Sequence, residues 1–163
     1  LGGDDFDTAF AKWVASGIWQ ALSIDVTKDA ILSDKIQRQC ELVKRALSSK
    51  AEVRYLIADA LGSAGRQRSI DVMVKREQLS VPWGELVDRS IEATRTAFLA
   101  SNLEMEQIGG VLLIGGTTAI PQVRAAVAQH FPRPLAVENE PQTAVARGAA
   151  LLAAQPGLLG AIS

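Results

Sequence analysis

The stretch IGGVLLIGGTTAIP, residues 108–121, constrains the fold of this chain more than any other part of the sequence. Its apolar run at residues 111–114 is bounded by turn signals, which is typical of a buried strand in a parallel sheet. Gly115 and Gly116 then allow a positive φ or a close approach of the backbone to a ligand. The threonines and Pro121 that follow favour the start of a helix. This order predicts an α/β fold and a loop whose free N–H groups can hold a phosphate or a nucleotide, although a simple tight turn fits the same pattern. The lysine of a P-loop and the third glycine of a dinucleotide fingerprint are both missing from the stretch.

The composition excludes several classes of function. The 163 residues are 48% hydrophobic and 21% charged, which predicts one globular domain or two small lobes. The formal net charge of -1 offers no basic surface, so neither nucleic acid nor a membrane is an expected partner. The uncharged tail, residues 148–163, is too short for a membrane span. Cys40 is the single cysteine, which excludes an internal disulfide and a cysteine-based zinc site and indicates a reducing, cytoplasmic compartment. The single histidine, His130, leaves little room for His-dependent catalysis or a multi-His metal site, and we predict no catalytic and no metal-binding residue in this chain. The opening Leu-Gly-Gly, without methionine or signal peptide, predicts a piece of a longer protein.

The first half of the chain predicts two helices and a hairpin. Asp4, Asp5 and Asp7 precede an apolar helical stripe and are expected to cap free N–H groups at the start of that helix. A second helix over residues 30–49 carries one apolar face and one polar face. The polar face consists of Glu41, Lys44, Arg45 and Ser48. Since Glu41 can pair with both cations, an ion-paired surface in contact with water explains this face from the sequence alone.

Alternating apolar residues at 53–57 and 70–74 predict a β-hairpin that turns at residues 62–67. Residues 80–84, SVPWG, interrupt the helical periodicity and are expected to separate two lobes, with a third helix from about Glu85. After the glycine turn, we expect a fourth helix from Pro121, a strand at residues 135–137, and a fifth helix whose first turn takes Pro141.

Four segments resemble motifs of one family, and they occur in the same order. They are LGGDDFD at residues 1–7, CELVKRALSS at 40–49, LLIGGTTAIPQV at 112–123 and EPQTAVARGAA at 140–150. Together they are similar to the nucleotide-binding domain of the seventy-kilodalton heat-shock chaperones of the DnaK type, within the actin-like ATPase superfamily. The resemblance implies the second lobe of a partial α/β, ribonuclease H-like ATPase domain. Residues 1–80 would form a small subdomain of helices and a β-hairpin, and residues 81–163 would form half of the α/β core.

The resemblance also implies a set of nucleotide-binding residues. Glu41, Lys44 and Ser48 would hydrogen-bond adenosine, and the Arg45 guanidinium would lie flat against the base. The backbone at residues 115–117 would face the phosphate and ribose. This second set is Gly115, Gly116 and Thr117, with Gln142 nearby.

Two positions differ from the family pattern. Ala119 replaces an arginine that helps to sandwich adenine, and Gln142 replaces an aspartate near the nucleotide. We therefore expect weakened or altered recognition of the base.

For the intact protein, the resemblance implies binding of ATP or ADP with Mg²⁺, and lobe closure coupled to ATP hydrolysis and protein folding. The fragment itself is not expected to hydrolyse ATP. Expected partners are an exchange factor on the small subdomain and client proteins, and exposed apolar surface favours self-association of the fragment. A non-chaperone actin-like ATPase or sugar kinase remains an alternative, as does a catalytically silent regulatory or adaptor module of the same fold.

Overall fold

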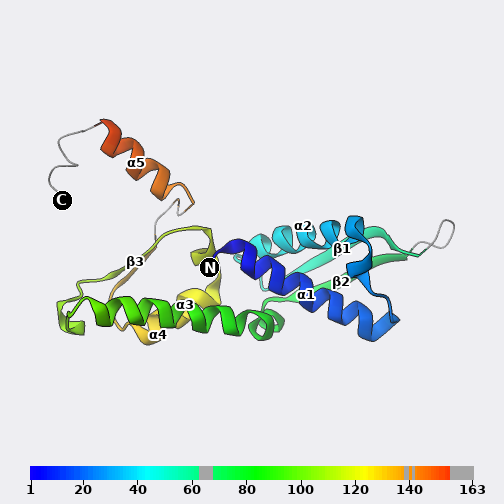
Figure 1. Ribbon diagram of the computed structural model, residues 1–163, viewed down its shortest axis with the longest axis horizontal. Helices are drawn as coiled ribbons and strands as arrows, with labels where there is room; N and C mark the ends of the chain where they lie inside the picture. The colour runs from blue at the N-terminus through cyan, green and yellow to red at the C-terminus, as the bar shows by residue number, and fades with distance from the viewer. Residues whose placement is uncertain (63–67, 138–139, 141, 155–163) are drawn as a thin grey trace. The chain divides into compact units, whose positions relative to one another are not determined.

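The chain divides into two compact units, Leu1–Thr94 and Arg95–Ser163. The structure is a computed structural model that describes residues 1–62, 68–137, 140 and 142–154 (Figure 1). It is a mixed helix and sheet fold in which two small sheets lie in different units. The lobe boundary expected at residue 80 refers to the intact domain and stays a prediction.

The first unit is built from two long helices and a hairpin. Its elements are α1 (Gly3–Leu22), α2 (Ala30–Leu47), β1 (Glu52–Leu61) and β2 (Arg68–Lys75), with short 3-10 turns at Val26–Lys28 and Arg76–Leu79. β1 and β2 pair in antiparallel register, with Tyr55 opposite Val72, and the register is irregular between Ile57 and Leu61. Both predicted helices and the predicted hairpin are thus confirmed. Most of the expected turn at residues 62–67 lies outside the described residues.

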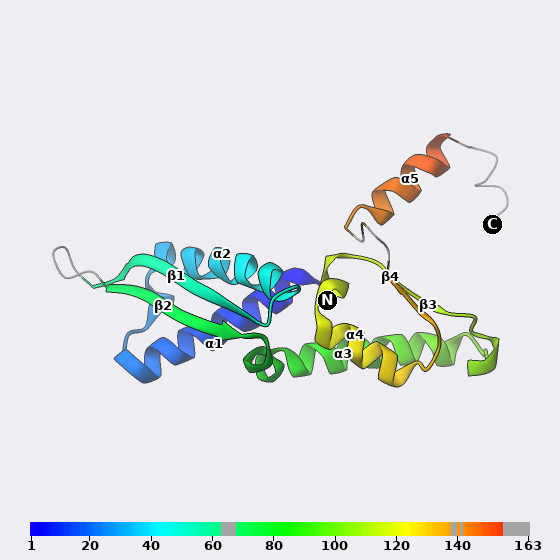
Figure 2. The same cartoon turned by 180° about the vertical axis from the view of Figure 1, so that it is seen from behind.

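Both helices lie on the same face of the hairpin, as Figure 2 shows. The core between them is dominated by aromatic and branched side chains. Its most buried members include Phe6, Phe10, Ile36, Cys40, Val43, Leu47, Tyr55, Val74 and Trp83. The Tyr55 hydroxyl donates to the backbone carbonyl of Ile36 at 3.3 Å, which joins the sheet to α2. The Phe10 ring of α1 lies 6.0 Å from the Tyr55 ring, so one tyrosine contacts both helices.

The two ends of α2 are fixed by side chains. At the N-terminus, the Asp29 carboxylate accepts the backbone N–H groups of Ile31 and Leu32, both at 3.0 Å. At the other end, the Arg76 guanidinium donates to the carbonyl oxygens of Leu47 at 2.7 Å and Lys50 at 2.6 Å. The bonds to Ile31, Leu32 and Leu47 satisfy backbone groups that a helix leaves unpaired at its termini, and the bond to Lys50 holds the segment that follows the helix. The polar face of α2 is therefore presented by a helix anchored at both ends.

The third helix, α3 (Ser80–Ala100), begins five residues earlier than expected. The interruption predicted at residues 80–84 is wrong because Pro82 falls in the first helical turn, where its missing N–H breaks no helical bond. Gly84 also continues the helix. Trp83 is buried and donates its indole N–H to the carbonyl oxygen of Phe6 at 2.9 Å, so the start of α3 is attached to α1.

The second unit contains the strand and the glycine turn predicted at residues 108–121. β3 (Val111–Leu113) pairs in parallel with β4 (Leu135–Val137), and α4 (Pro121–His130) and α5 (Ala144–Ala154) follow the two strands. The parallel pairing and the proline at the first turn of α4 are confirmed. The strand is less buried than expected: Leu112 is 60% exposed, and the described sheet around it has two strands.

The helix starts in this unit differ from the expectation in detail. Gly116–Ala119 forms a 3-10 turn of its own, so the threonines do not cap α4. α5 starts at Ala144, and the expected first-turn Pro141 lies outside the described residues.

Candidate functional site

Three of the four predicted residues on the polar face of α2 lie as the sequence suggested. Glu41 and Arg45 form an ion pair at 2.6 Å, and their side chains are 45% and 64% exposed. Ser48 follows the last residue of α2, and its hydroxyl donates to the carbonyl of Lys44 at 3.3 Å. The face thus presents a carboxylate, a guanidinium and a hydroxyl within two helical turns.

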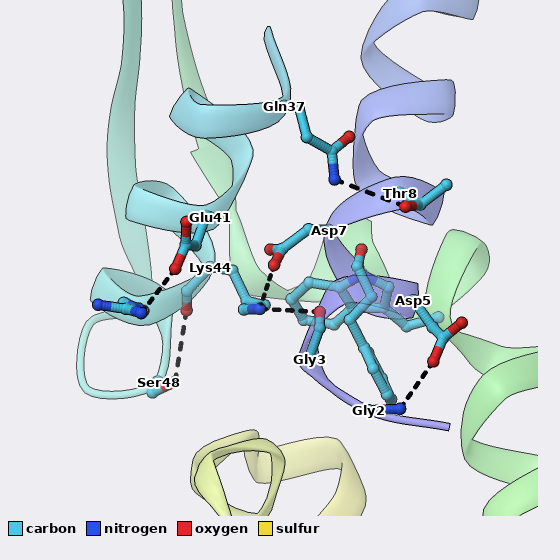
Figure 3. Close-up of polar contacts among 12 residues, drawn as sticks. Gly2, Gly3, Asp5, Asp7, Thr8, Gln37, Glu41, Lys44 and Ser48 are labelled. Carbon is cyan, nitrogen blue, oxygen red and sulfur yellow. Dashed lines mark hydrogen bonds and ion pairs between the residues drawn. The ribbon is translucent and has the colours of Figure 1, made fainter. Parts of the chain in front are cut away.

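Lys44 does not pair with Glu41, so that part of the sequence interpretation is wrong. Its ammonium nitrogen donates instead to the Asp7 carboxylate at 2.6 Å and to the Gly3 carbonyl at 2.9 Å (Figure 3). Both acceptors belong to the first turns of α1, 37 and 41 residues earlier in the chain. The Lys44 side chain is only 12% exposed. This contact joins the predicted site directly to the LGGDDFD segment.

The capping role expected for Asp7 is wrong. The expected capping is made by Asp5, whose carboxylate accepts the Gly2 N–H at 2.7 Å, whereas Asp7 is 4% exposed and pairs with Lys44. A usable signal was present: Asp7 lies three and seven residues before Phe10 and Val14, on the apolar face of α1. A carboxylate on a buried face needs a cation or several hydrogen bonds.

The electrostatics of Asp7 follow from its burial. Removal from water raises the pKa of the Asp7 carboxyl above its usual value, although the hydrogen bond and charge of Lys44 act in the opposite direction. The negative charges of Glu41 and Asp4 also raise the pKa. Its second oxygen, Oδ1, is buried and has no hydrogen-bond partner among the described residues.

The glycine turn of the second unit has the geometry of a tight, glycine-dependent loop. Gly115 has φ 89° and ψ 152°, a combination that residues with a side chain rarely adopt. Its carbonyl accepts both the backbone N–H of Thr118 at 3.1 Å and the Thr118 hydroxyl at 2.7 Å. The carbonyl of Thr117 accepts the N–H of Ile120 at 3.1 Å. The loop is therefore fixed by internal bonds, with Gly116 on its exposed side.

Gln142 lies against this loop, which brings two predicted site residues together. A methyl group added at Gly116 would meet the side-chain nitrogen of Gln142 at 3.2 Å. Ala119 ends the 3-10 turn and is half-buried. The loop residues and the α2 residues belong to different units, and each set is described within its own unit.

Other kinds of site are not found in the described part of the chain. No group of three or more His, Cys, Asp and Glu side chains there could hold a metal ion. None of the described helices combines the length and apolar character needed to cross a membrane.

Comparison with known proteins connects these residues to one family. The family model described as Hsp70 protein matches residues 1–157. The chain is 36% identical over 157 residues to a "Chaperone protein HscA homolog" of Acidovorax ebreus, covering 95% of this chain and 23% of that protein. It is 33% identical over 165 residues to "Chaperone protein dnaK1" of Synechococcus elongatus, covering 98% of this chain and 25% of that protein. The chain thus spans about a quarter of the length of these relatives.

Proposed function

The chain belongs to the Hsp70 family, and on this premise we propose that it supplies the adenosine-binding part of an ATP-binding chaperone domain. The observation that carries the proposal is the polar face of α2. Its exposed Glu41–Arg45 pair and the anchored Lys44 lie side by side on a helix fixed at both ends. This family has the actin-like ATPase fold, and we assign the chain to the second lobe of that fold.

The exposed Arg45 guanidinium is suited to an adenine ring. A guanidinium is planar and stacks on aromatic faces, and Glu41 already orients this one at 2.6 Å without burying it. The Glu41 carboxylate still has lone pairs that can accept from a nucleoside, because a carboxylate offers about four acceptor positions. The Ser48 hydroxyl can accept as well as donate. We therefore propose Glu41, Lys44 and Ser48 as hydrogen-bonding groups and Arg45 as the stacking group.

We assign the loop around Gly115, Gly116 and Thr117 to the phosphate and ribose side of a bound nucleotide. The positive φ of Gly115 and the exposed Gly116 leave backbone accessible to a ligand. Gln142, which contacts Gly116, offers an amide in place of the carboxylate typical of the family. An amide is neutral, so Gln142 carries no negative charge near the phosphates, and it can both donate and accept hydrogen bonds.

Ala119 should lower the selectivity for adenine over other bases, because it stands where the family usually has arginine. Loss of one stacking face would cost on the order of 1 kcal/mol of binding free energy. Calorimetry with ATP and GTP tests this point: we expect weakened discrimination between them, and Ala119→Arg should restore preference for ATP. Tight, ATP-exclusive binding by the unmodified protein would contradict it.

For the whole protein we propose Mg²⁺-dependent ATP hydrolysis coupled to lobe closure and protein folding in the cytoplasm. The catalytic carboxylates and γ-phosphate chemistry are assigned to segments outside these 163 residues, and client proteins and an exchange factor are the expected partners. A silent adaptor module is the alternative that Ala119 and Gln142 favour. ATP turnover by the complete protein, stimulated by an unfolded client, would support the chaperone; nucleotide binding without turnover would support the adaptor.

Neighbouring serines provide a matched test of the adenosine assignment. Ser48→Ala removes a hydroxyl from the proposed site, whereas Ser49→Ala removes an exposed hydroxyl that donates to the Ala46 carbonyl. We expect Ser48→Ala to weaken ADP binding by roughly threefold to tenfold, the usual value of one neutral hydrogen bond. Ser49→Ala should leave affinity unchanged. Equal affinities for the two variants would argue against the assignment.

A further inference from the structure

The Lys44 ammonium is held at two points and retains one further donor. Among the described residues its hydrogen-bond acceptors are the Asp7 carboxylate and the Gly3 carbonyl, at 2.6 and 2.9 Å (Figure 3). A lysine ammonium has three N–H donors. Because the side chain is 12% exposed, it is largely withdrawn from water but not sealed. The third N–H therefore remains available to a ligand.

The carboxylate that holds Lys44 lies on a turn of α1 that is packed into the core. Phe6, next to Asp7, is 1% exposed and packs edge-on against Trp83 with ring centroids 5.6 Å apart. The indole N–H of Trp83 donates to the Phe6 carbonyl. The second acceptor, Gly3, lies beside Gly2, whose N–H is held by Asp5 at 2.7 Å. The α1 turn that receives Lys44 is thus fixed on both sides.

Stability alone does not account for this arrangement. Buried ion pairs often contribute nothing relative to well-packed apolar residues, because desolvation offsets the attraction between the charges. Asp7 has an additional cost, since its Oδ1 is buried without a hydrogen-bond partner in the described part of the chain. A pair that is costly to bury and next to a proposed ligand site is better explained by a role in binding.

We propose that Asp7 is a positioning residue for nucleoside recognition, which holds Lys44 so that its third N–H is directed at a ribose hydroxyl of the bound nucleotide. This inference rests on the proposed function. A free lysine has a flexible four-carbon chain, and ordering it on binding lowers affinity. Asp7 orders Lys44 before the ligand arrives, so the binding step avoids that cost. A hydroxyl oxygen is a suitable target because an ammonium can only donate.

A purely structural clamp between α1 and α2 predicts a different result from a positioning role. Loss of a clamp would weaken the binding of every nucleotide to a similar extent, since the whole face of α2 would become less ordered. Loss of positioning would weaken the binding only of ligands that carry the hydroxyl group that Lys44 contacts. Comparison of ADP with 2′,3′-dideoxy-ADP separates the two roles.

The test measures both affinities calorimetrically in the complete protein that carries this chain. Asp7→Asn should weaken the binding of ADP by about tenfold, as expected for a charge-assisted hydrogen bond that loses its orientation. The affinity for 2′,3′-dideoxy-ADP should be nearly unchanged. Asp71→Asn is the matched control, because it breaks the exposed Arg54–Asp71 pair on the hairpin of the same unit. It should change neither affinity. In a Lys44→Met background, Asp7→Asn should have no further effect on ADP.

Equal losses for both nucleotides, or unchanged ADP affinity in Asp7→Asn, would overturn the positioning role while the proposed function stands. Failure of the unmodified protein to bind ADP would overturn both. Circular dichroism and thermal unfolding establish that each variant is folded. If Asp7→Asn does not fold, Asp7→Glu provides the same comparison, because it keeps the charge but displaces the carboxylate by one methylene. A selective loss of ADP affinity is again expected, and an equal loss for both nucleotides would contradict the role.

Discussion

The indole N–H of Trp83 donates to the backbone carbonyl of Phe6 at 2.9 Å, across 77 residues of sequence. The two rings also meet edge-on, with centroids 5.6 Å apart, and both residues are 1% exposed. This contact fixes the first turn of α3 against the turn of α1 that carries Asp7. The aromatic core is therefore continuous with the residues that hold Lys44.

Replacement of this tryptophan should lower stability measurably. Trp83→Phe keeps an aromatic ring but removes the indole donor. The Phe6 carbonyl, which also accepts a backbone N–H within α1, loses this second hydrogen bond, and the smaller ring leaves unfilled space in the core. The expected loss in free energy of unfolding is about 2 kcal/mol, measured by chemical denaturation. Trp19→Phe is the control, because Trp19 is 54% exposed, and should change stability by less than about 0.5 kcal/mol. A similar small change for both variants would show that the indole hydrogen bond contributes little.

Much of the first unit was predictable because its signals are local. The α2 helix was expected over residues 30–49 and is observed at Ala30–Leu47, since its apolar residues recur at intervals of three and four. The hairpin followed from alternation alone. The start of α3 was missed because a proline is tolerated in a first helical turn, so it marks a boundary less sharply than its usual role suggests.

The Asp7–Lys44 pair was not predictable in the same way. Its partners are 37 residues apart, and each has a nearer alternative: an N-terminal cap for Asp7 and Glu41 for Lys44. Tertiary packing of α1 on α2 decides between these options. The exposure of Leu112 likewise depends on tertiary context. Its apolar run predicts a buried strand, whereas the described sheet around β3 has two strands and leaves Leu112 exposed.

Cys40 should be inert towards alkylation in the folded protein. Its side chain is fully buried, its Sγ lies 3.7 Å from the Tyr55 hydroxyl oxygen, and burial raises the pKa of the thiol to about 12. Because the thiolate is the reactive form, iodoacetamide at pH 8 should label Cys40 only as fast as the protein unfolds. Mass spectrometry of the peptide that contains Cys40 measures the rate. Labelling as fast in native buffer as in concentrated guanidinium would contradict the buried position.

Gly115 should not tolerate a side chain. At φ 89° and ψ 152° an alanine would be strained, at a cost of about 1–3 kcal/mol in stability of the loop. Gly115→Ala should therefore lower the unfolding temperature and weaken nucleotide binding. Gly109→Ala is the matched control, since a methyl group there meets nothing within 4 Å and the backbone has no positive φ. Equal unfolding temperatures for the two variants would refute the claim of a glycine-dependent loop.

The Asp7 carboxyl should contribute a pH dependence of defined sign. Its pKa is raised by burial, and further by Glu41 and Asp4, while Lys44 opposes the rise; the Cys40 thiol also lies within its electrostatic influence. The folded state then binds a proton more tightly than the unfolded state. The usual pKa of an aspartate in an unfolded chain is about 4. As the pH rises from that value through the raised pKa of the folded state, the Asp7 carboxyl progressively lowers the free energy of unfolding.

Two variants isolate that contribution in denaturation experiments between pH 4 and pH 7. Asp7→Asn should remove the decline, because it has no proton to lose. Lys44→Met should steepen it and lower stability at neutral pH by about 3 kcal/mol, since it leaves a buried carboxylate without its cation. A stability difference between the unmodified protein and Asp7→Asn that does not vary with pH would contradict this account.

The claim that the polar face of α2 binds adenosine is tested most directly by calorimetric titration of ADP into the complete protein and two arginine variants. Arg45 and Arg38 lie seven residues apart on α2, and each is exposed and paired with a carboxylate four residues earlier, at 2.6 and 2.9 Å. Arg45→Ala should weaken ADP binding by about tenfold, because it removes the stacking cation, whereas Arg38→Ala should leave affinity unchanged. Equal ADP affinity in Arg45→Ala, Arg38→Ala and the unmodified protein would contradict the central claim.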